Sequence, residues 1–137
     1  MTGLIACLAV LAAATGYGPA HRYRDRRARV RAKDGDERLT AADLGGPLGD
    51  RATLVQFSSA FCAPCRATRR VLGDVAAMVD GVNHIEVDAE AHLDLVRRLN
   101  VLKTPTVLVL DAGGAVVRRA AGQPRKADVI AALGAAV

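Results

Sequence analysis

Phe61-Cys62-Ala63-Pro64-Cys65-Arg66 is the stretch that decides the fold, because it lies between an apolar, strand-like segment and a long helical pattern. Two cysteines separated by two residues can close a small disulfide ring without moving the backbone when the first stands at a helix start. The free N–H groups of that helix start favour a thiolate on the first cysteine. The stretch therefore predicts thiol–disulfide exchange at Cys62 and Cys65.

The segments on either side of this motif alternate between strand and helix patterns. Residues 53–57 are mostly apolar and rich in β-formers, which predicts a buried strand. From Cys62 to about Val79, apolar residues recur at three- and four-residue spacing, which predicts a helix that tolerates Pro64 in its first turn. The order β-α-β-α-β-β-α predicts an α/β fold with parallel crossovers early and an antiparallel hairpin late. The remaining predicted elements are a brief helix over 41–44 after Thr40, strands over 83–88, 106–110 and 116–117, and helices over 93–99 and 124–136.

The composition predicts one folded domain, since 51 % of the 137 residues are hydrophobic. The net charge of +5 comes from one short basic run, in which seven basic residues less Asp25 supply +6. The other 12 basic residues face 13 acidic ones, which leaves the rest of the chain near −1. With no basic excess there, and with no Trp for base stacking, nucleic-acid binding is not predicted. The basic run comprises Arg22, Arg24, Arg26, Arg27, Arg29, Arg31 and Lys33.

The first 20 residues carry no charged side chain, and residues 4–14 are uninterruptedly apolar. Twenty residues of helix reach about 30 Å, roughly the hydrocarbon thickness of a bilayer. A cleaved secretory signal has positive charge before its apolar region, whereas here all the positive charge follows it. The sequence therefore predicts a single transmembrane anchor at 1–20, a basic juxtamembrane linker at 21–36 that attracts anionic lipid, and a domain at 37–137. The positive-inside rule places that domain in the cytoplasm; the alternative is that residues 1–20 are a leader removed from the mature chain.

The chain resembles the thioredoxin family over roughly residues 39–133. The resemblance rests on Cys-Ala-Pro-Cys at the strand-to-helix turn together with Lys103-Thr104-Pro105-Thr106 before the hairpin. It implies the thioredoxin fold, a central mixed sheet flanked by helices. It also implies protein disulfides as substrates, an upstream reductase or other electron donor as partner, and no cofactor or metal beyond the Cys62–Cys65 disulfide.

The resemblance also implies a role for each residue of the motifs. Cys62 matches the nucleophile that forms a mixed disulfide with the substrate, and Cys65 matches the resolving cysteine that releases the product. Pro105 matches the family's cis-proline, which lies against the cysteine pair and leaves the backbone of Thr104 free to pair with an extended substrate. The implied substrate-binding residues are Phe61, Ala63, Pro64, Thr104 and Pro105.

The chain departs from the family pattern beneath the cysteine pair. Gln56 stands where typical thioredoxins place a buried Asp, and an amide cannot titrate as a proton acceptor. His84 aligns with the family's nearby Lys and is a candidate base or partner near neutral pH. The simpler interpretation of His84 is a histidine at the surface or at a strand end. Proton handling by Gln56 and His84 is therefore an open question for the structure.

Three other functions are weighed against disulfide reduction. A zinc site usually needs four ligands, but the third cysteine, Cys7, lies in the predicted anchor, and His84 and His92 are too far apart in sequence. A non-catalytic thioredoxin-fold adaptor is favoured by Gln56 and disfavoured by the retained cysteines and prolines. An extracytoplasmic, membrane-tethered oxidoreductase is the third alternative. Ala63-Pro64 is close to the Gly-Pro of reducing thioredoxins, which favours a reductase.

Overall fold

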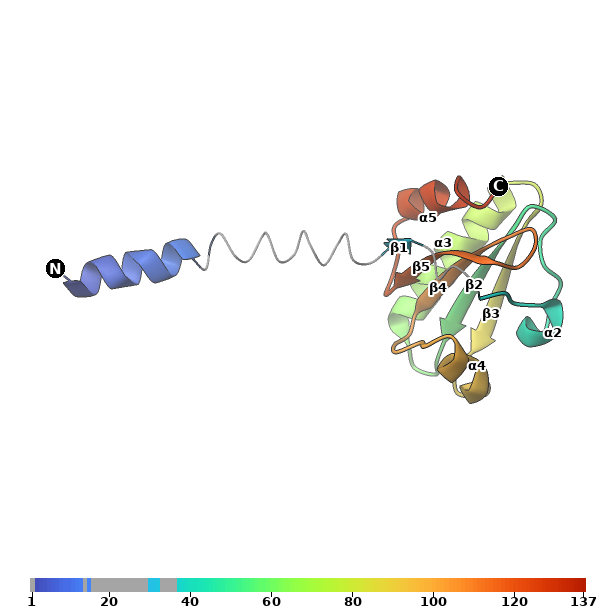
Figure 1. The fold of residues 1–137 in the computed structure, drawn as a ribbon, viewed down its shortest axis with the longest axis horizontal. Coiled ribbons are helices and arrows are strands. Elements are labelled where there is room, and N and C mark those ends of the chain that lie inside the picture. The colour runs from blue at the N-terminus through green and yellow to red at the C-terminus, as the bar shows by residue number, and fades with distance from the viewer. Residues whose placement is uncertain (1, 14, 16–29, 33–36) are drawn as a thin grey trace.

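The computed structural model describes residues 2–13, 15, 30–32 and 37–137. Figure 1 shows helices on both faces of one sheet. The sheet has five strands in the order β1-β5-β4-β2-β3, in which β2 pairs with β3 in parallel and the other neighbours are antiparallel. The predicted mixed sheet is confirmed, and so is the predicted order of elements from α2 onward. The elements are β1 (Val30–Ala32), α2 (Ala41–Leu44), β2 (Ala52–Ser58), α3 (Ala63–Met78), β3 (Val82–Asp88), α4 (Leu93–Arg98), β4 (Thr106–Asp111), β5 (Val116–Ala121) and α5 (Lys126–Leu133).

Strand β2 lies in the interior of the sheet and is buried along its whole length. Because successive side chains of a strand point to opposite faces, it contributes to two apolar clusters. On one face Phe57 packs with Leu44 of α2 and Leu95 of α4. On the other face Leu54 packs with Leu72 of α3. These two clusters hold β2 rigidly, and the site begins where this strand ends.

Helix α3 begins directly after Cys62, which is its N-cap residue. Its buried side chains are Cys65, Thr68, Leu72 and Val75, which recur at three- and four-residue spacing. This spacing confirms the predicted helix and the stripe by which it packs on the sheet. The stripe begins with Cys65, so the first turn of α3 presents one cysteine to the interior and its N-cap presents the other outward.

The sheet includes a strand within the segment predicted to be a linker. The sequence predicts a linker over 21–36, but β1 lies inside that range and pairs antiparallel with β5, with Val30 opposite Ala120. Backbone groups make this pairing, and an unpaired β5 edge would accept any extended segment. A prediction based on charge and apolar pattern has no signal for such a strand.

The predicted transmembrane anchor lies partly outside the described residues. Residues 2–13 and 15 are helical, whereas residues 1, 14 and 16–20 are not described. Among the described residues, no helix combines the length and the apolar character needed to cross a membrane. Most of the basic run, residues 22–29 and 33, also lies outside the described ranges.

Candidate active site

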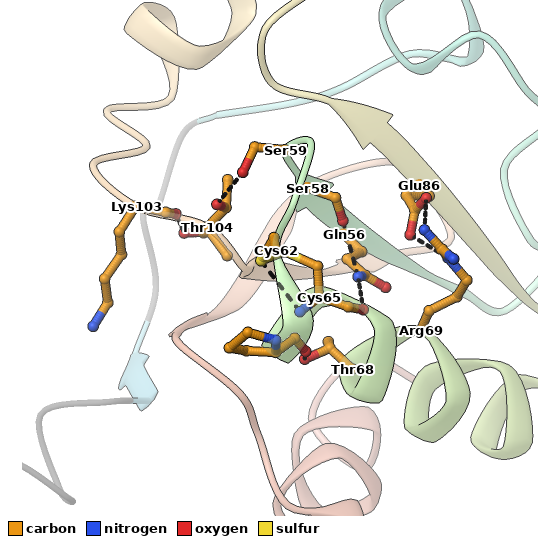
Figure 2. The surroundings of a disulfide bond; sticks show 12 residues. Gln56, Ser58, Ser59, Cys62, Cys65, Thr68, Arg69, Glu86, Lys103 and Thr104 are labelled. Carbon is orange, nitrogen blue, oxygen red and sulfur yellow. Dashed lines mark hydrogen bonds and ion pairs between the residues drawn. A yellow bond between two sulfur atoms is a disulfide. The ribbon is translucent and has the colours of Figure 1, made fainter.

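Cys62 and Cys65 form a disulfide at the start of α3 (Figure 2). Their Cα atoms are 5.2 Å apart, and the Cys65 backbone N–H donates to Cys62 Sγ at 3.2 Å. Cys62 is partly exposed, whereas Cys65 retains only 2 % of its exposure. An incoming sulfur therefore reaches Cys62 first, and Cys65 lies behind it.

The turn into α3 holds the first cysteine at the surface. Phe61 has a left-handed backbone with φ of 58°, which is uncommon for an aromatic residue, and its side chain is fully exposed. Pro64 stands in the first turn of α3, and its carbonyl accepts a hydrogen bond from Thr68 Oγ1 at 2.8 Å. Ala63 and Pro64 are both exposed. The motif residues predicted to meet a substrate thus surround Cys62 on the surface.

The loop before β4 reaches the same place from a distant part of the chain. Its Thr104–Pro105 peptide bond is cis, as the resemblance implies. Thr104 Oγ1 and Ser59 Oγ are 2.7 Å apart, and Ser59 stands three residues before Cys62 (Figure 2). The structure thus brings Thr104 to the cysteine loop, and Pro105 beside it is buried. Lys103 extends away from the cysteines in Figure 2.

Gln56 forms a polar floor beneath the start of α3. Its side chain is fully buried, with Nε2 donating to the Cys65 carbonyl at 2.8 Å and to Ser58 Oγ at 3.0 Å. Its Oε1 lies 3.1 Å from Nε2 of His84. Every polar atom of the amide therefore has a partner, which is the condition for burying it without a large penalty.

His84 lies within β3 and is half-buried, with its ring against the Gln56 amide. The simpler interpretation of His84 as a histidine at the surface or at a strand end is therefore wrong. Burial lowers the pKa of His84, while the charge of Glu86 raises it and that of Arg69 lowers it. Arg69 and Glu86 bind each other through two hydrogen bonds of 2.7 Å, which link α3 to β3 (Figure 2). The structure thus joins both residues predicted to handle protons.

Sequence reasoning missed Ser59 and the Arg69–Glu86 pair. Ser59 and its partner Thr104 are 45 positions apart in the sequence, and Arg69 and Glu86 are 17 positions apart. No local spacing predicts either contact. Within the described parts of the chain, no three His, Cys, Asp or Glu side chains gather as ligands for a metal ion.

Comparison with known proteins finds thioredoxins by family model, by sequence and by structure. The thioredoxin family model matches residues 46–135. Putative thioredoxin H10 of Arabidopsis thaliana is 31 % identical over 78 residues, which cover 57 % of this chain and 48 % of the plant protein, so the chain spans about half of that relative's length. Thioredoxin of Staphylococcus aureus is 26 % identical over 90 residues, which cover 65 % of this chain and 86 % of that protein.

Two solved structures share the fold. Schistosoma mansoni thioredoxin preprotein matches with a TM-score of 0.55 and 19 % identity, over 65 % of this chain and 82 % of that one. A mutant thioredoxin from Halobacterium salinarum matches with a TM-score of 0.57 and 17 % identity, over 64 % and 77 % of the two chains. With a family match that includes the cysteine pair and the cis-proline, this chain belongs to the thioredoxin family.

Proposed function

We propose that this chain is a thiol–disulfide oxidoreductase that reduces protein disulfides by cycling Cys62 and Cys65 between dithiol and disulfide. The observation that carries the proposal is the contrast between the two sulfurs. Cys62 is partly exposed at the N-cap of α3, and Cys65 is buried one turn further on. Attack on a substrate requires an exposed sulfur such as that of Cys62. A buried sulfur next to it, such as that of Cys65, suits the intramolecular release of the product.

The cycle transfers two electrons from the cysteine pair to the substrate. The Cys62 thiolate attacks one sulfur of the substrate disulfide, forms a mixed disulfide and releases the other sulfur as a thiolate. Cys65 then loses its proton and attacks Cys62 Sγ, which closes the Cys62–Cys65 bond and releases the second substrate sulfur. An upstream reductase or electron donor returns two electrons and two protons to the pair.

The start of α3 supports the thiolate form of Cys62. The unpaired N–H groups of a helix start carry a partial positive charge, and the Cys65 N–H points at Cys62 Sγ. A thiolate there is both more abundant and directed toward solvent. The sequence Ala63-Pro64 favours a reductase within this chemistry, because it resembles the Gly-Pro of reducing thioredoxins.

The surface around Cys62 supports a protein substrate. Phe61 is fully exposed and Leu102, in the loop before the cis-proline, is 86 % exposed. Exposed apolar side chains beside a reactive sulfur and in the loop that contacts its turn suit a peptide segment better than a small polar disulfide. The backbone of Thr104 is the expected partner for that segment.

The test is reduction of insulin disulfides by the full chain, with dithiothreitol as electron donor. We expect Cys62→Ser to reduce the rate to that of dithiothreitol alone. Cys65→Ser, reduced beforehand and mixed with insulin after the dithiothreitol has been removed, keeps the first attack and accumulates the mixed disulfide, which mass spectrometry detects. Cys7→Ser is the matched control, because Cys7 lies on the N-terminal helix outside the disulfide, and its rate is expected to equal that of the wild type.

Full activity of Cys62→Ser would overturn the proposal and leave the adaptor alternative, in which the domain binds a partner without chemistry. A wild type that never exceeds the rate of dithiothreitol alone leads to the same conclusion.

We also propose that residues 1–20 anchor the chain to a membrane with its domain in the cytoplasm. The support is the order of an uncharged apolar segment followed by a basic run. A reporter fused after Val137 that is active only in the cytoplasm is the expected result. A reporter active only outside the cytoplasm would contradict it and favour the extracytoplasmic alternative.

A further inference from the structure

A chain of hydrogen bonds leads from the resolving cysteine to the edge of the core. It passes from the Cys65 carbonyl to the Gln56 amide at 2.8 Å, and from that amide to His84 at 3.1 Å. Ser58 joins it from the side, since its Oγ lies 3.0 Å from Gln56 Nε2. Gln56 is fully buried and His84 is half-buried, so little solvent competes for these bonds.

The direction of each bond follows from what each atom can do. The Cys65 carbonyl can only accept, so the Gln56 NH2 group must face it. Gln56 Oε1 then faces His84 and can only accept, so His84 Nε2 must donate. The neutral ring therefore carries its proton on Nε2 and leaves Nδ1 free to take a second proton.

Apart from the two cysteines, the buried groups near these hydrogen bonds do not offer a competing titration near neutral pH. The buried polar residues among those described are Thr53, Gln56, Ser58, Thr68 and Thr106, none of which ionises in that range. The charged groups that act on His84 are Glu86 on its own strand β3 and Arg69 on α3. These two bind each other and carry opposite charges, and because of the opposite charges their effects on the ring oppose one another. His84 is the titratable group at the far end of this series of hydrogen bonds from Cys65.

We propose that His84 is a positioning residue for Cys65 that acts through the Gln56 amide, so that protonation of His84 assists the resolving step. The proposal rests on the thiol–disulfide exchange proposed above. An imidazolium donates a stronger hydrogen bond to Gln56 Oε1 than neutral imidazole does, which polarises the amide. The Gln56 Nε2–H that donates to the Cys65 carbonyl then carries more positive charge. This charge stabilises a thiolate on Cys65 more strongly.

The resolving step itself exchanges no atom with His84 or Gln56. Cys65 loses its thiol proton to solvent, and its sulfur forms the bond to Cys62 Sγ. The bond between Cys62 and the bound thiol breaks, and the leaving sulfur keeps the electron pair. His84 changes only how well the turn around Cys65 tolerates the thiolate.

The test isolates this step with one equivalent of Ellman's reagent and pre-reduced full-length protein that carries Cys7→Ser. The first coloured thiolate reports attack by Cys62, and the second reports resolution by Cys65, so no protein substrate is needed. His84→Gln is the key variant, because its amide can still donate to Gln56 Oε1 but cannot titrate. We expect the ratio of the resolution rates, wild type over His84→Gln, to rise about threefold or more between pH 7.5 and 5.5.

Gln56→Met separates coupling through the amide from a direct effect of charge. In this background we expect the ratio of rates with and without His84→Gln to stay constant with pH. Superimposable pH profiles of wild type and His84→Gln would overturn the proposal, and a pH-dependent ratio that survives Gln56→Met would overturn the role of Gln56.

A measurement on the wild type alone keeps the proposal testable if Gln56→Met does not fold. Nitrogen NMR of the histidine rings is expected to show the neutral His84 ring protonated on Nε2. A ring protonated on Nδ1 would overturn the proposal. The Ellman's reaction also distinguishes this failure from that of the proposed function, because inactivity toward insulin leaves the second thiol release measurable.

Discussion

Phe57 and Gln56 are consecutive residues of β2, and neither has any exposed surface, yet they lie in different chemical environments. Phe57 points into the cluster formed with α2 and α4, where its neighbours are apolar. Gln56 points toward α3, and its amide forms hydrogen bonds with Cys65, Ser58 and His84. One face of the same strand stabilises the fold, and the other supports the reactive pair.

The difference follows from how each interaction depends on geometry. Apolar burial is proportional to area and has little directionality, so the Phe57 face gains stability from volume and packing. Hydrogen bonds of a buried amide are directional, and each unmade one costs free energy, so the Gln56 face fixes the positions of specific atoms. Substitutions on the two faces should therefore differ in kind as well as in size.

The largest expected effect is on the apolar face. We expect Phe57→Ala to reduce the free energy of unfolding by about 3–5 kcal/mol, because it removes a fully buried ring and leaves a cavity. Urea denaturation at pH 7.5 measures this loss. Met78→Ala is the control, since Met78 is 64 % exposed and its loss should stay within about 0.5 kcal/mol. Equal losses in the two variants would contradict the comparison.

Gln56→Met is expected to have a smaller effect on stability. The substitution leaves the Cys65 carbonyl and the His84 ring without their buried partner, which costs about 1–3 kcal/mol in the free energy of unfolding. The same variant should slow the resolving step, whereas Phe57→Ala should leave the rate per folded molecule unchanged. Urea denaturation and the Ellman's assay, run on both variants, check this. Slower resolution in Phe57→Ala alone would reverse the assignment of the two faces.

Thr40→Ala tests the local structure of the apolar face. The Thr40 side chain accepts from the Asp43 N–H, and Asp43 bonds back to the Thr40 N–H, which completes a capping box for α2. We expect a loss of about 1 kcal/mol in the free energy of unfolding, and less for the matched variant Thr40→Ser. A loss as large for Ser as for Ala would show that the hydroxyl is not the cause.

The pH dependence of stability gives the smallest expected effect. Burial lowers the pKa of folded His84 below its ordinary value of 6.5, so protonation favours the unfolded state. Its contribution to stability is present above pH 6.5 and decreases as the pH falls below that value. Urea denaturation at pH 7.5 and 5.5 should therefore show a larger decrease for wild type than for His84→Gln. An equal decrease would place the cause in other groups.

Local pattern predicted much of this molecule. The spacing of apolar residues in α3, the short apolar run of β2 and the Thr40 cap are all decided by neighbours within a few positions. The Cys62–Cys65 pair is of the same kind, since its geometry is contained in one helix turn. The role of Pro105 came from resemblance to a family, because no local rule selects a cis bond.

The sequence by itself determined the elements from α2 to α5, their order and the cysteine pair, because hydrogen bonds within a helix turn and burial along a strand depend on nearby residues. Only the tertiary structure decided what surrounds that pair. The parallel register of β2 and β3, with Gln56 opposite Glu86, brings His84 within reach of the Gln56 amide. Ser59 likewise meets Thr104 because the loop before β4 folds onto the start of α3. Register and loop closure are properties of the assembled sheet, and no short stretch of sequence contains them.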